Sequence, residues 1–254
     1  MVTGSGGRVG EQSTGCVVEA CVRRMVGVVA IAVALGTAAG CQGFELPAGG
    51  ATASRSAAGP TKTGSAPAAK VPIASVLKAR VQLSTLRVAP AREGGYQRTR
   101  DFGPAWSVDV DRNGCGTRDD ILRRDLTKVR LRGRCTVIAG VLADPYTGQT
   151  VTFTKSAAVK VQIDHLVPLG AAWIRGARDW PQTQRERFAN DPANLLATTA
   201  SANESKSDRG PAEWLPRQVY RCAYAVQWIA VSTSYKLVLT PPDKASLTTL
   251  LDRC

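Results

Sequence analysis

The sequence predicts an α+β fold in which a strand–strand–helix unit is flanked by further helices and an antiparallel hairpin. The run from Val159 to Val167 is apolar and β-branched on both sides of an Asp-His pair, so it is expected to form a strand that turns at Pro168 and Gly170. A second short apolar run, Leu195 to Thr198, indicates the partner strand. The two runs lie far enough apart to require a long connection.

A helix is expected directly after the second strand. Ser201 is a suitable N-cap for this helix, which would carry Asn203 and Lys206. In a strand–strand–helix arrangement, Asp164, His165 and Asn203 could converge on one site.

His165 is the single histidine among 254 residues. Imidazole is the side chain whose ordinary pKa lies nearest neutrality, so His165 is the natural candidate for a general base. The alternative is that His165 is a packed core residue, with Asp164 on the opposite strand face merely capping a turn. Asn194, which precedes the second strand, is equally compatible with ordinary turn chemistry.

The ordered set is Asp164-His165-x-x-Pro168, then Asn194, then Asn203-x-x-Lys206. This set resembles the HNH endonuclease family, in the branch with an Asp-His pair found in CRISPR effector nucleases and in the C-terminal domain of GmrSD-type proteins. It is most similar to small secreted proteins of the second kind. The resemblance extends over roughly residues 75–254, through DRNGCGTRDDILRRDL, DPYTG, FANDPANLLA and YRCAYAVQWIAV.

The resemblance implies a ββα-metal core that hydrolyses phosphodiesters, with His165 taking a proton from water. Asp164 and Asn203 offer hard oxygen ligands, which suit one Mg²⁺ or Mn²⁺ and argue against a structural zinc. By the same resemblance, Asn194 would help to orient His165, and Lys206 would lie near the metal or the phosphate.

The charge favours a polyanionic partner. The chain carries a formal charge of +13, and residues 71–254 hold 27 Lys and Arg against 17 Asp and Glu, which leaves about +10 there. Arg118, in a helix expected over Thr117 to Leu126, is a candidate phosphate contact. No base-reading module is recognisable, so the expected substrate is DNA, or alternatively RNA, cut with low sequence specificity. No protein partner is predicted.

Residues 1–41 are expected to form an export signal. Val26 to Ala39 is uncharged and too short for a comfortable membrane span, and it leads into the small residues that precede Cys41. This pattern resembles a bacterial lipobox in which Cys41 is lipidated and anchors the protein to the membrane. Ala38 stands where Leu is preferred, so free secretion and a retained anchor are alternatives. A start at Met25 is another alternative, and it would remove the basic residues that precede the apolar run.

Residues 42–70 are rich in Ala, Gly, Ser, Thr and Pro and are expected to form a flexible tether. The folded domain is then expected over residues 71–254. Its remaining predicted elements, in chain order, are a helix over Ile73 to Leu86, paired strands over Cys135 to Leu142 and Thr150 to Thr154, a helix over Trp214 to Tyr235 and a short helix after Pro242.

A polar segment precedes the Thr117 helix. Its acidic and amide residues fall on positions 1, 3, 5, 6 and 12 of a calcium loop, with Asp in place of the usual final Glu: Asp109, Asp111, Asn113, Gly114 and Asp120. A polar turn with a helix cap is the favoured alternative, because Cys115 indicates a disulfide inside the loop.

Four cysteines in an exported domain indicate two disulfides. Of the three possible connectivities, we prefer Cys115 with Cys135 and Cys222 with Cys254, because each pair closes a loop within one contiguous segment.

Two other functions remain open from the sequence. The first is a non-catalytic nucleic-acid-binding lipoprotein with the same fold. The second is a structural envelope protein, which predicts His165 buried away from any basic cleft.

Overall fold

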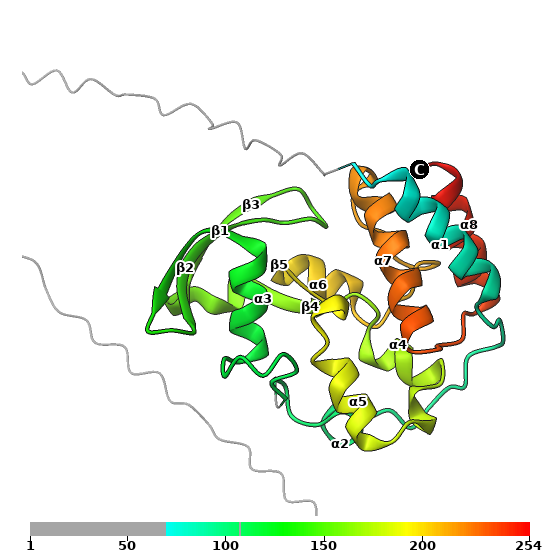
Figure 1. The fold of residues 1–254 in the computed structure, drawn as a ribbon, viewed down its shortest axis with the longest axis horizontal. Helices are drawn as coiled ribbons and strands as arrows, with labels where there is room; N and C mark the ends of the chain where they lie inside the picture. The colour runs from blue at the N-terminus through cyan, green and yellow to red at the C-terminus, as the bar shows by residue number, and fades with distance from the viewer. Residues whose placement is uncertain (1–69, 107) are drawn as a thin grey trace, which may run out of the picture. The chain divides into compact units, whose positions relative to one another are not determined.

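The computed structural model describes residues 70–106 and 108–254. The predicted export signal, Cys41 and the tether up to residue 69 lie outside the described residues. The fold is α+β, as predicted, with helices around two small antiparallel sheets (Figure 1). In the described part of the chain, no helix is both long and apolar enough to cross a membrane.

The strand–strand–helix unit has the predicted order. Strand β4 (Val161–His165) pairs antiparallel with β5 (Leu195–Thr199), and helix α6 (Ala200–Lys206) follows β5 directly. Every residue of β5 is buried, because the hairpin separates two cores. Leu195 and Ala197 pack into the core that α3 (Thr117–Asp125) shares with the larger sheet, whereas Leu196 packs into the core of the terminal helices.

The connection between β4 and β5 folds back on itself. It contains helices α4 (Leu169–Ile174) and α5 (Gln182–Ala189), with short 3-10 turns η2 (Ala177–Asp179) and η3 (Pro192–Asn194). Helix α5 packs against α2 (Arg98–Phe102), which brings the segment before residue 107 close to the end of β4.

The second sheet has the order β1-β2-β3, with α3 packed against it. Its strands are β1 (Leu126–Arg132), β2 (Thr136–Ala143) and β3 (Thr150–Thr154), all antiparallel, and a 3-10 segment η1 (Lys155–Lys160) leads from β3 into β4. The β2–β3 pairing was predicted, but β1 was not. Val129 and Leu131 alternate with charged residues, which is typical of a strand. This pattern was overlooked because the charged helix α3 directly precedes it.

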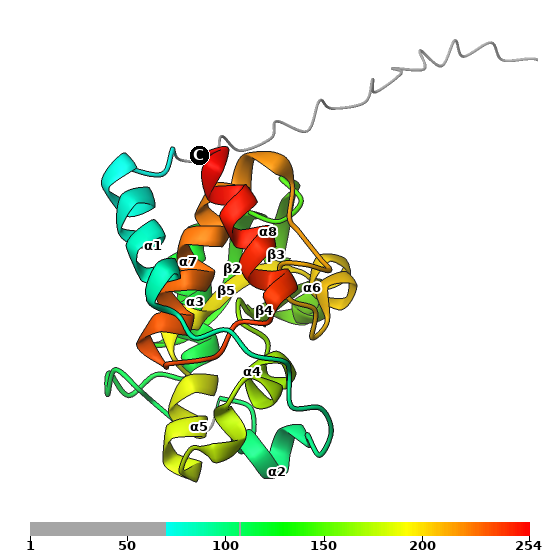
Figure 2. The ribbon, with the colours of Figure 1, turned by 90° about the vertical axis from the view of Figure 1, so that its right-hand side faces the viewer.

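The terminal helices form the other core. Helices α1 (Ile73–Thr85), α7 (Arg221–Ser234) and α8 (Pro241–Asp252) lie side by side in two perpendicular views (Figures 1 and 2). Tyr224 and Trp228 of α7 are fully buried, and the Tyr224 ring packs against Tyr146 and Trp214. Through this packing, α7 supports the turn between the end of β4 and the start of α4.

Four local predictions were wrong. The first strand begins at Val161, because η1 occupies the preceding residues, and Gly170 lies inside α4, where Pro168 is the N-cap. Ser201 does not cap α6, since the helix begins at Ala200. The helix predicted from Trp214 begins at Arg221, after a 3-10 turn, η4 (Gln218–Tyr220).

Both preferred disulfides are present. Cys115 bonds to Cys135 with 5.3 Å between their Cα atoms, and Cys222 bonds to Cys254 with 5.6 Å. The first ties the loop before α3 to the tip of the β1–β2 hairpin, and the second ties α7 to the end of the chain.

Candidate nuclease site

The end of β4 lines a cleft of about 540 Å³. Asp164 and His165 lie in its wall with Asn203 of α6, and the rim carries the cationic side chains Arg98 and Arg118. Three of the predicted site residues therefore come together, as the strand–strand–helix order suggested. The cleft joins segments that are more than 100 residues apart in the chain, since Tyr96 and Asp208 also line it.

His165 is held as a neutral imidazole. Its Nε2 lies 2.8 Å from the carbonyl oxygen of Ala189, and because a carbonyl only accepts, Nε2 carries the proton and Nδ1 keeps its lone pair. Burial lowers the pKa of His165 to about 3, with the charges of Arg98 and Lys206 acting in the same direction. The ring is therefore a proton acceptor at neutral pH.

Trp106 covers one face of this imidazole. The two rings are nearly parallel, at 5°, with their centroids 6.0 Å apart. Only 8% of His165 is exposed. The indole therefore shields the imidazole from water and contributes to the burial that depresses its pKa.

Asp164 accepts hydrogen bonds from two buried donors. The Tyr146 hydroxyl donates to Oδ2 at 2.6 Å, and Lys206 Nζ lies 3.1 Å from Oδ1 and 3.0 Å from Oδ2. Burial raises the pKa of the Asp164 carboxyl and lowers the pKa of Lys206, while the attraction between the two charges opposes both shifts.

Lys206 also binds the strand that carries the site. Its Nζ donates to the carbonyl oxygen of His165 at 2.8 Å, and its side chain is fully buried. Lys206 thus fixes the end of β4 from α6. The prediction that it lies near the metal or phosphate remains untested, but its contact with Asp164 places it beside the proposed ligand.

Asn203 lies one turn before Lys206 on α6. Its Nδ2 donates to Gln162 Oε1 at 2.7 Å, which orients the amide and leaves Oδ1 as a free acceptor. Gln162 also lines the cleft.

Asn194 is fully buried and holds the turn after His165. Its Oδ1 accepts from the Val167 N–H at 2.8 Å, and its Nδ2 donates to the Val167 carbonyl at 3.1 Å. The side chain touches the backbone two residues beyond His165 and not the imidazole. Any orienting role is therefore exerted through the turn.

Arg118 lines the cleft, and its guanidinium also bonds to backbone carbonyls. Its Nη2 donates to the carbonyls of Ala158 at 3.2 Å and Val161 at 2.8 Å. Its role as a phosphate contact stays a prediction.

Oxygen donors in the cleft fit a hard divalent cation. A carboxylate offers about four lone-pair sites, and Tyr146, Lys206 and the His165 backbone N–H all face Asp164, so a metal there would share a carboxylate oxygen with one of these donors. Asn203 Oδ1 would be the second protein ligand, and water and substrate phosphate would complete the shell. Within the described residues, no cluster of three or more His, Cys, Asp or Glu side chains is arranged to hold a metal.

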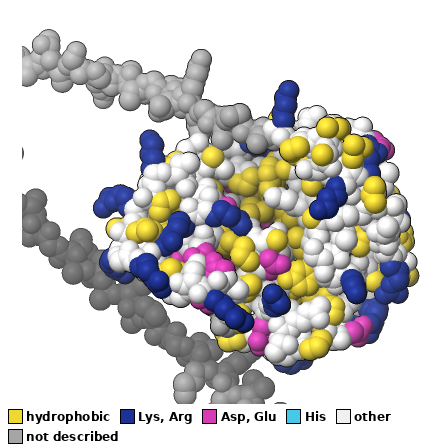
Figure 3. All heavy atoms as spheres, in the orientation of Figure 1, with side chains coloured by type: hydrophobic (Ala, Val, Ile, Leu, Met, Phe, Trp, Pro, Cys, Tyr) yellow, Lys and Arg dark blue, Asp and Glu magenta, His cyan; other side chains and the backbone are white. Residues whose placement is uncertain are grey.

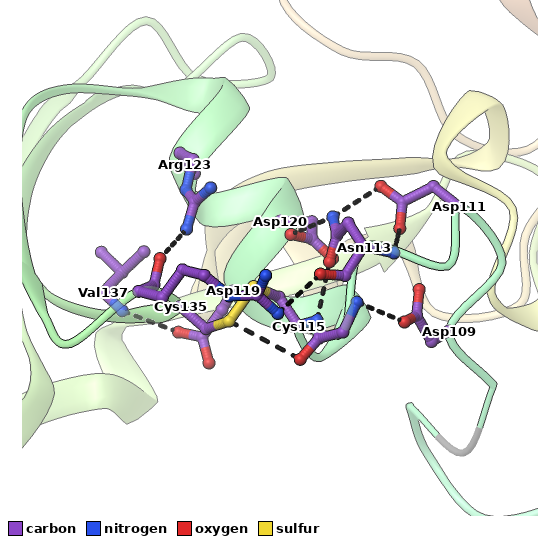
Figure 4. Close-up of a disulfide and its surroundings, with 11 residues drawn as sticks. Asp109, Asp111, Asn113, Cys115, Asp119, Asp120, Arg123, Cys135 and Val137 are labelled. Atoms are coloured by element: carbon purple, nitrogen blue, oxygen red, sulfur yellow. Dashed lines mark hydrogen bonds between the residues drawn. A yellow bond between two sulfur atoms is a disulfide. The ribbon is translucent and has the colours of Figure 1, made fainter.

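The candidate calcium loop is a hydrogen-bonded polar turn (Figure 4). Asn113 Nδ2 donates to Asp111 at 2.7 Å and to Asp120 at 3.0 Å, and the Gly114 N–H donates to Asp109 at 2.8 Å. The Asn113 amide bonds to both carboxylates, so the polar turn expected as the alternative is present, but the predicted helix cap is not, since the N-cap of α3 is Gly116.

Tyr146, Trp106, Gln162 and the Ala189 carbonyl were not identified from the sequence. Tyr146 stands in the Asp-Pro-Tyr-Thr-Gly turn, but turn chemistry gives no sign that its hydroxyl reaches Asp164. Trp106 lies in an irregular segment without periodicity. No sequence signal could have placed either residue.

Residues 116–248 match the family described as GmrSD restriction endonucleases, C-terminal domain. The chain belongs to this family. The match contains all of β4, β5 and α6, and therefore every predicted residue of the site, whereas Trp106 and Arg98 precede it. No solved structure matches the chain.

A fungal relative shares more of the chain. An uncharacterized secreted protein of Arthroderma benhamiae is 42% identical over 187 residues, which cover 72% of this chain and 87% of the relative. The similarity therefore extends beyond the family match.

Proposed function

We propose that this GmrSD C-terminal domain is an exported, metal-dependent HNH endonuclease that hydrolyses DNA, or alternatively RNA, with low sequence specificity. One observation carries the proposal: a neutral imidazole with a free Nδ1 lies in a cleft beside a carboxylate and an amide oxygen, with arginines at the rim. Family membership supports a nuclease rather than another hydrolase.

Each residue of the site has a separate role in the proposed reaction. His165 takes a proton from the attacking water through Nδ1, while the Ala189 carbonyl holds the opposite edge of the ring. Asp164 and Asn203 would hold Mg²⁺ or Mn²⁺, which supplies stabilisation of the charge that develops on the phosphate and the leaving oxygen. Arg98 and Arg118, which line the cleft, would attract the phosphate.

The low pKa of His165 belongs to the protein without substrate. A phosphate anion in the cleft would raise this pKa, whereas a cation held by Asp164 would lower it.

Export is supported by two observations. The fungal relative is described as secreted, and two disulfides are typical of proteins that mature in an oxidising compartment. Lipidation of Cys41 and a membrane anchor remain predictions about residues outside the described part.

The test is digestion of supercoiled plasmid by the full chain in Mg²⁺ or Mn²⁺, beside EDTA. His165→Gln is the main variant, because its amide can still donate to Ala189 but cannot act as a base. We expect metal-dependent cleavage that falls at least about 100-fold in this variant. Cleavage at a single defined sequence would contradict low specificity.

A non-catalytic nucleic-acid-binding protein is the second candidate. The hydrogen bonds that Tyr146 and Lys206 donate to Asp164 favour this non-catalytic function, because they occupy most of the carboxylate that would otherwise bind the metal. An uncut plasmid that still shifts on a gel would establish this function. The structural alternative predicted His165 buried away from a basic cleft; His165 is buried, and the cleft beside it carries Arg98 and Arg118 together with the carboxylates of Asp164 and Asp208.

A further inference from the structure

The larger sheet carries an unpaired row of positive charge. Lys128, Arg130 and Arg132 stand on its edge strand β1, and all three side chains are exposed. Within the described residues, none of them makes an ion pair or side-chain hydrogen bond. Figure 3 shows Lys and Arg side chains gathered over the part of the molecule that holds β1 and β2.

No acidic side chain on the sheet offsets this charge. Residues 126–160 hold six exposed cations and one anion, Asp144, which is fully buried. The Asp144 carboxylate accepts from the hydroxyls of Thr198 and Thr199, so it serves the fold and not the surface. The six cations are Lys128, Arg130, Arg132, Arg134, Lys155 and Lys160.

Arg134 is the member with an internal role. Its Nη2 donates to the Asn113 carbonyl at 2.9 Å, beside the disulfide that ties the hairpin tip to the acidic turn. The acidic side chains of that turn, Asp111 and Asp120, bond to Asn113. The three cations of β1 have no such partner.

The sheet is connected to the cleft through η1. This segment joins β3 to β4, and Arg118 of the cleft binds it through the Ala158 carbonyl. Lys160, exposed at the end of η1, directly precedes the strand that carries Asp164 and His165. Lys155 and Lys160 lie on the β3 side of the sheet and the cations of β1 on the opposite edge, so a polyanion that contacts both would cross the sheet from the cleft.

We propose that the β1-β2-β3 sheet binds the phosphate backbone of nucleic acid outside the cleft, so that the substrate is a polymer longer than the segment that is cut. This rests on the proposed function. The register of β1 shifts on both sides of Arg130, so Lys128 to Arg132 spans at most about 13 Å at about 3.3 Å per residue, or up to roughly four base-pair steps of about 3.4 Å. Most protein contacts to nucleic acid from Lys and Arg go to phosphates, so we expect the binding to be independent of sequence.

Charge on an edge strand has another known use. Lys and Arg there prevent two edges from pairing and aggregating. That role predicts aggregation, and no loss of affinity for nucleic acid, when the charges are removed.

The test compares two triple variants of the full chain. One removes the row, Lys128→Gln/Arg130→Gln/Arg132→Gln. The control removes the same charge from exposed side chains of the terminal helical region, Lys78→Gln/Lys236→Gln/Arg253→Gln. Lys128 and Lys236 also share a left-handed backbone, with φ of 51° and 54°, so the two variants match in that respect.

Binding to a duplex of about 40 base pairs is measured by fluorescence anisotropy in EDTA, from about 50 to about 200 mM KCl. Each phosphate contact contributes about 0.9 to the slope of log affinity against log salt, so the row variant should lose about 2.7 from that slope. At about 0.1 M salt this corresponds to a loss of affinity of up to roughly 500-fold. The control variant should keep the slope of the unmodified protein.

Equal slopes in both variants would overturn the inference, because only bulk charge would then matter. Aggregation of the row variant with unchanged affinity would assign the charges to edge protection. A third result is a row variant that binds the duplex normally but no longer sediments with vesicles of equimolar phosphatidylglycerol and phosphatidylcholine. That result would assign the three cations to lipid binding and would overturn the inference. Since EDTA removes any need for cleavage, a reduced slope supports the inference even if the plasmid digestion fails.

Discussion

The burial of His165 has a measurable effect on stability. Burial lowers the pKa of His165 from 6.5 to about 3. As the pH falls, His165 therefore binds a proton in the unfolded chain but not in the folded protein. The resulting loss of stability begins near pH 6.5 and continues down to the folded pKa. Between about pH 8 and about pH 4.5 the loss amounts to about 2.7 kcal/mol. For a domain of this size that lowers Tm by about 5–10 °C.

The comparison is between the unmodified chain and His165→Gln. Asp164, whose pKa is raised, titrates in both proteins, and so do the surface carboxylates, so the difference between the two isolates the imidazole. We expect Tm of the unmodified protein to fall by about 5–10 °C more than Tm of the variant.

The single histidine also allows a direct measurement. Proton NMR should show one Hε1 resonance, and it should not titrate between about pH 8 and about pH 4.5. Trp106→Ala should restore titration by opening one face of the ring. A resonance that titrates near 6.5 in the unmodified protein, or equal pH dependence of the two Tm values, would refute the burial argument.

Three further outcomes follow from the contacts. Lys206→Met leaves Asp164 buried without its cation, so urea titration should show a free energy of unfolding lower by about 3–5 kcal/mol. Adding Asp164→Asn to this variant should recover part of the loss. Asn194→Ala should cost about 3 kcal/mol and reduce the cleavage rate, since the turn after β4 loses two buried hydrogen bonds; an unchanged rate would separate the turn from catalysis. Replacing Cys115 and Cys135 with Ala should cost about 3 kcal/mol in thermal unfolding, because their bond closes a loop of 20 residues, and the same change under reducing conditions should have no added effect.

Local patterns predicted most of the fold. The β-branched run before His165, the apolar run after Asn194 and the helix that follows were located correctly because strands and helices leave their periods in the sequence. Strand β1 was missed, since its charged residues continue the pattern of α3. Ser201 was misassigned as a cap because Thr199, two residues earlier, is also a residue type that favours the N-cap, and the helix begins directly after it.

The grouping of three candidate site residues was predicted, but their contacts were not. The ordered set of Asp164, His165 and Asn203 pointed to one cleft, and the cleft contains them. Tyr146 and Trp106 were absent from that set, because a turn residue and an irregular segment carry no sign of their distant partners.

The sequence by itself determined the residue types of the candidate site, the number of cysteines in the domain and the sign of the charge, because these depend on identity and order along the chain. Only the tertiary structure decided that His165 is neutral, that Asp164 is paired with Lys206, and that the cations of β1 have no partner. A pKa and an ion pair depend on desolvation and distance in space, and packing sets both between segments that the sequence leaves far apart.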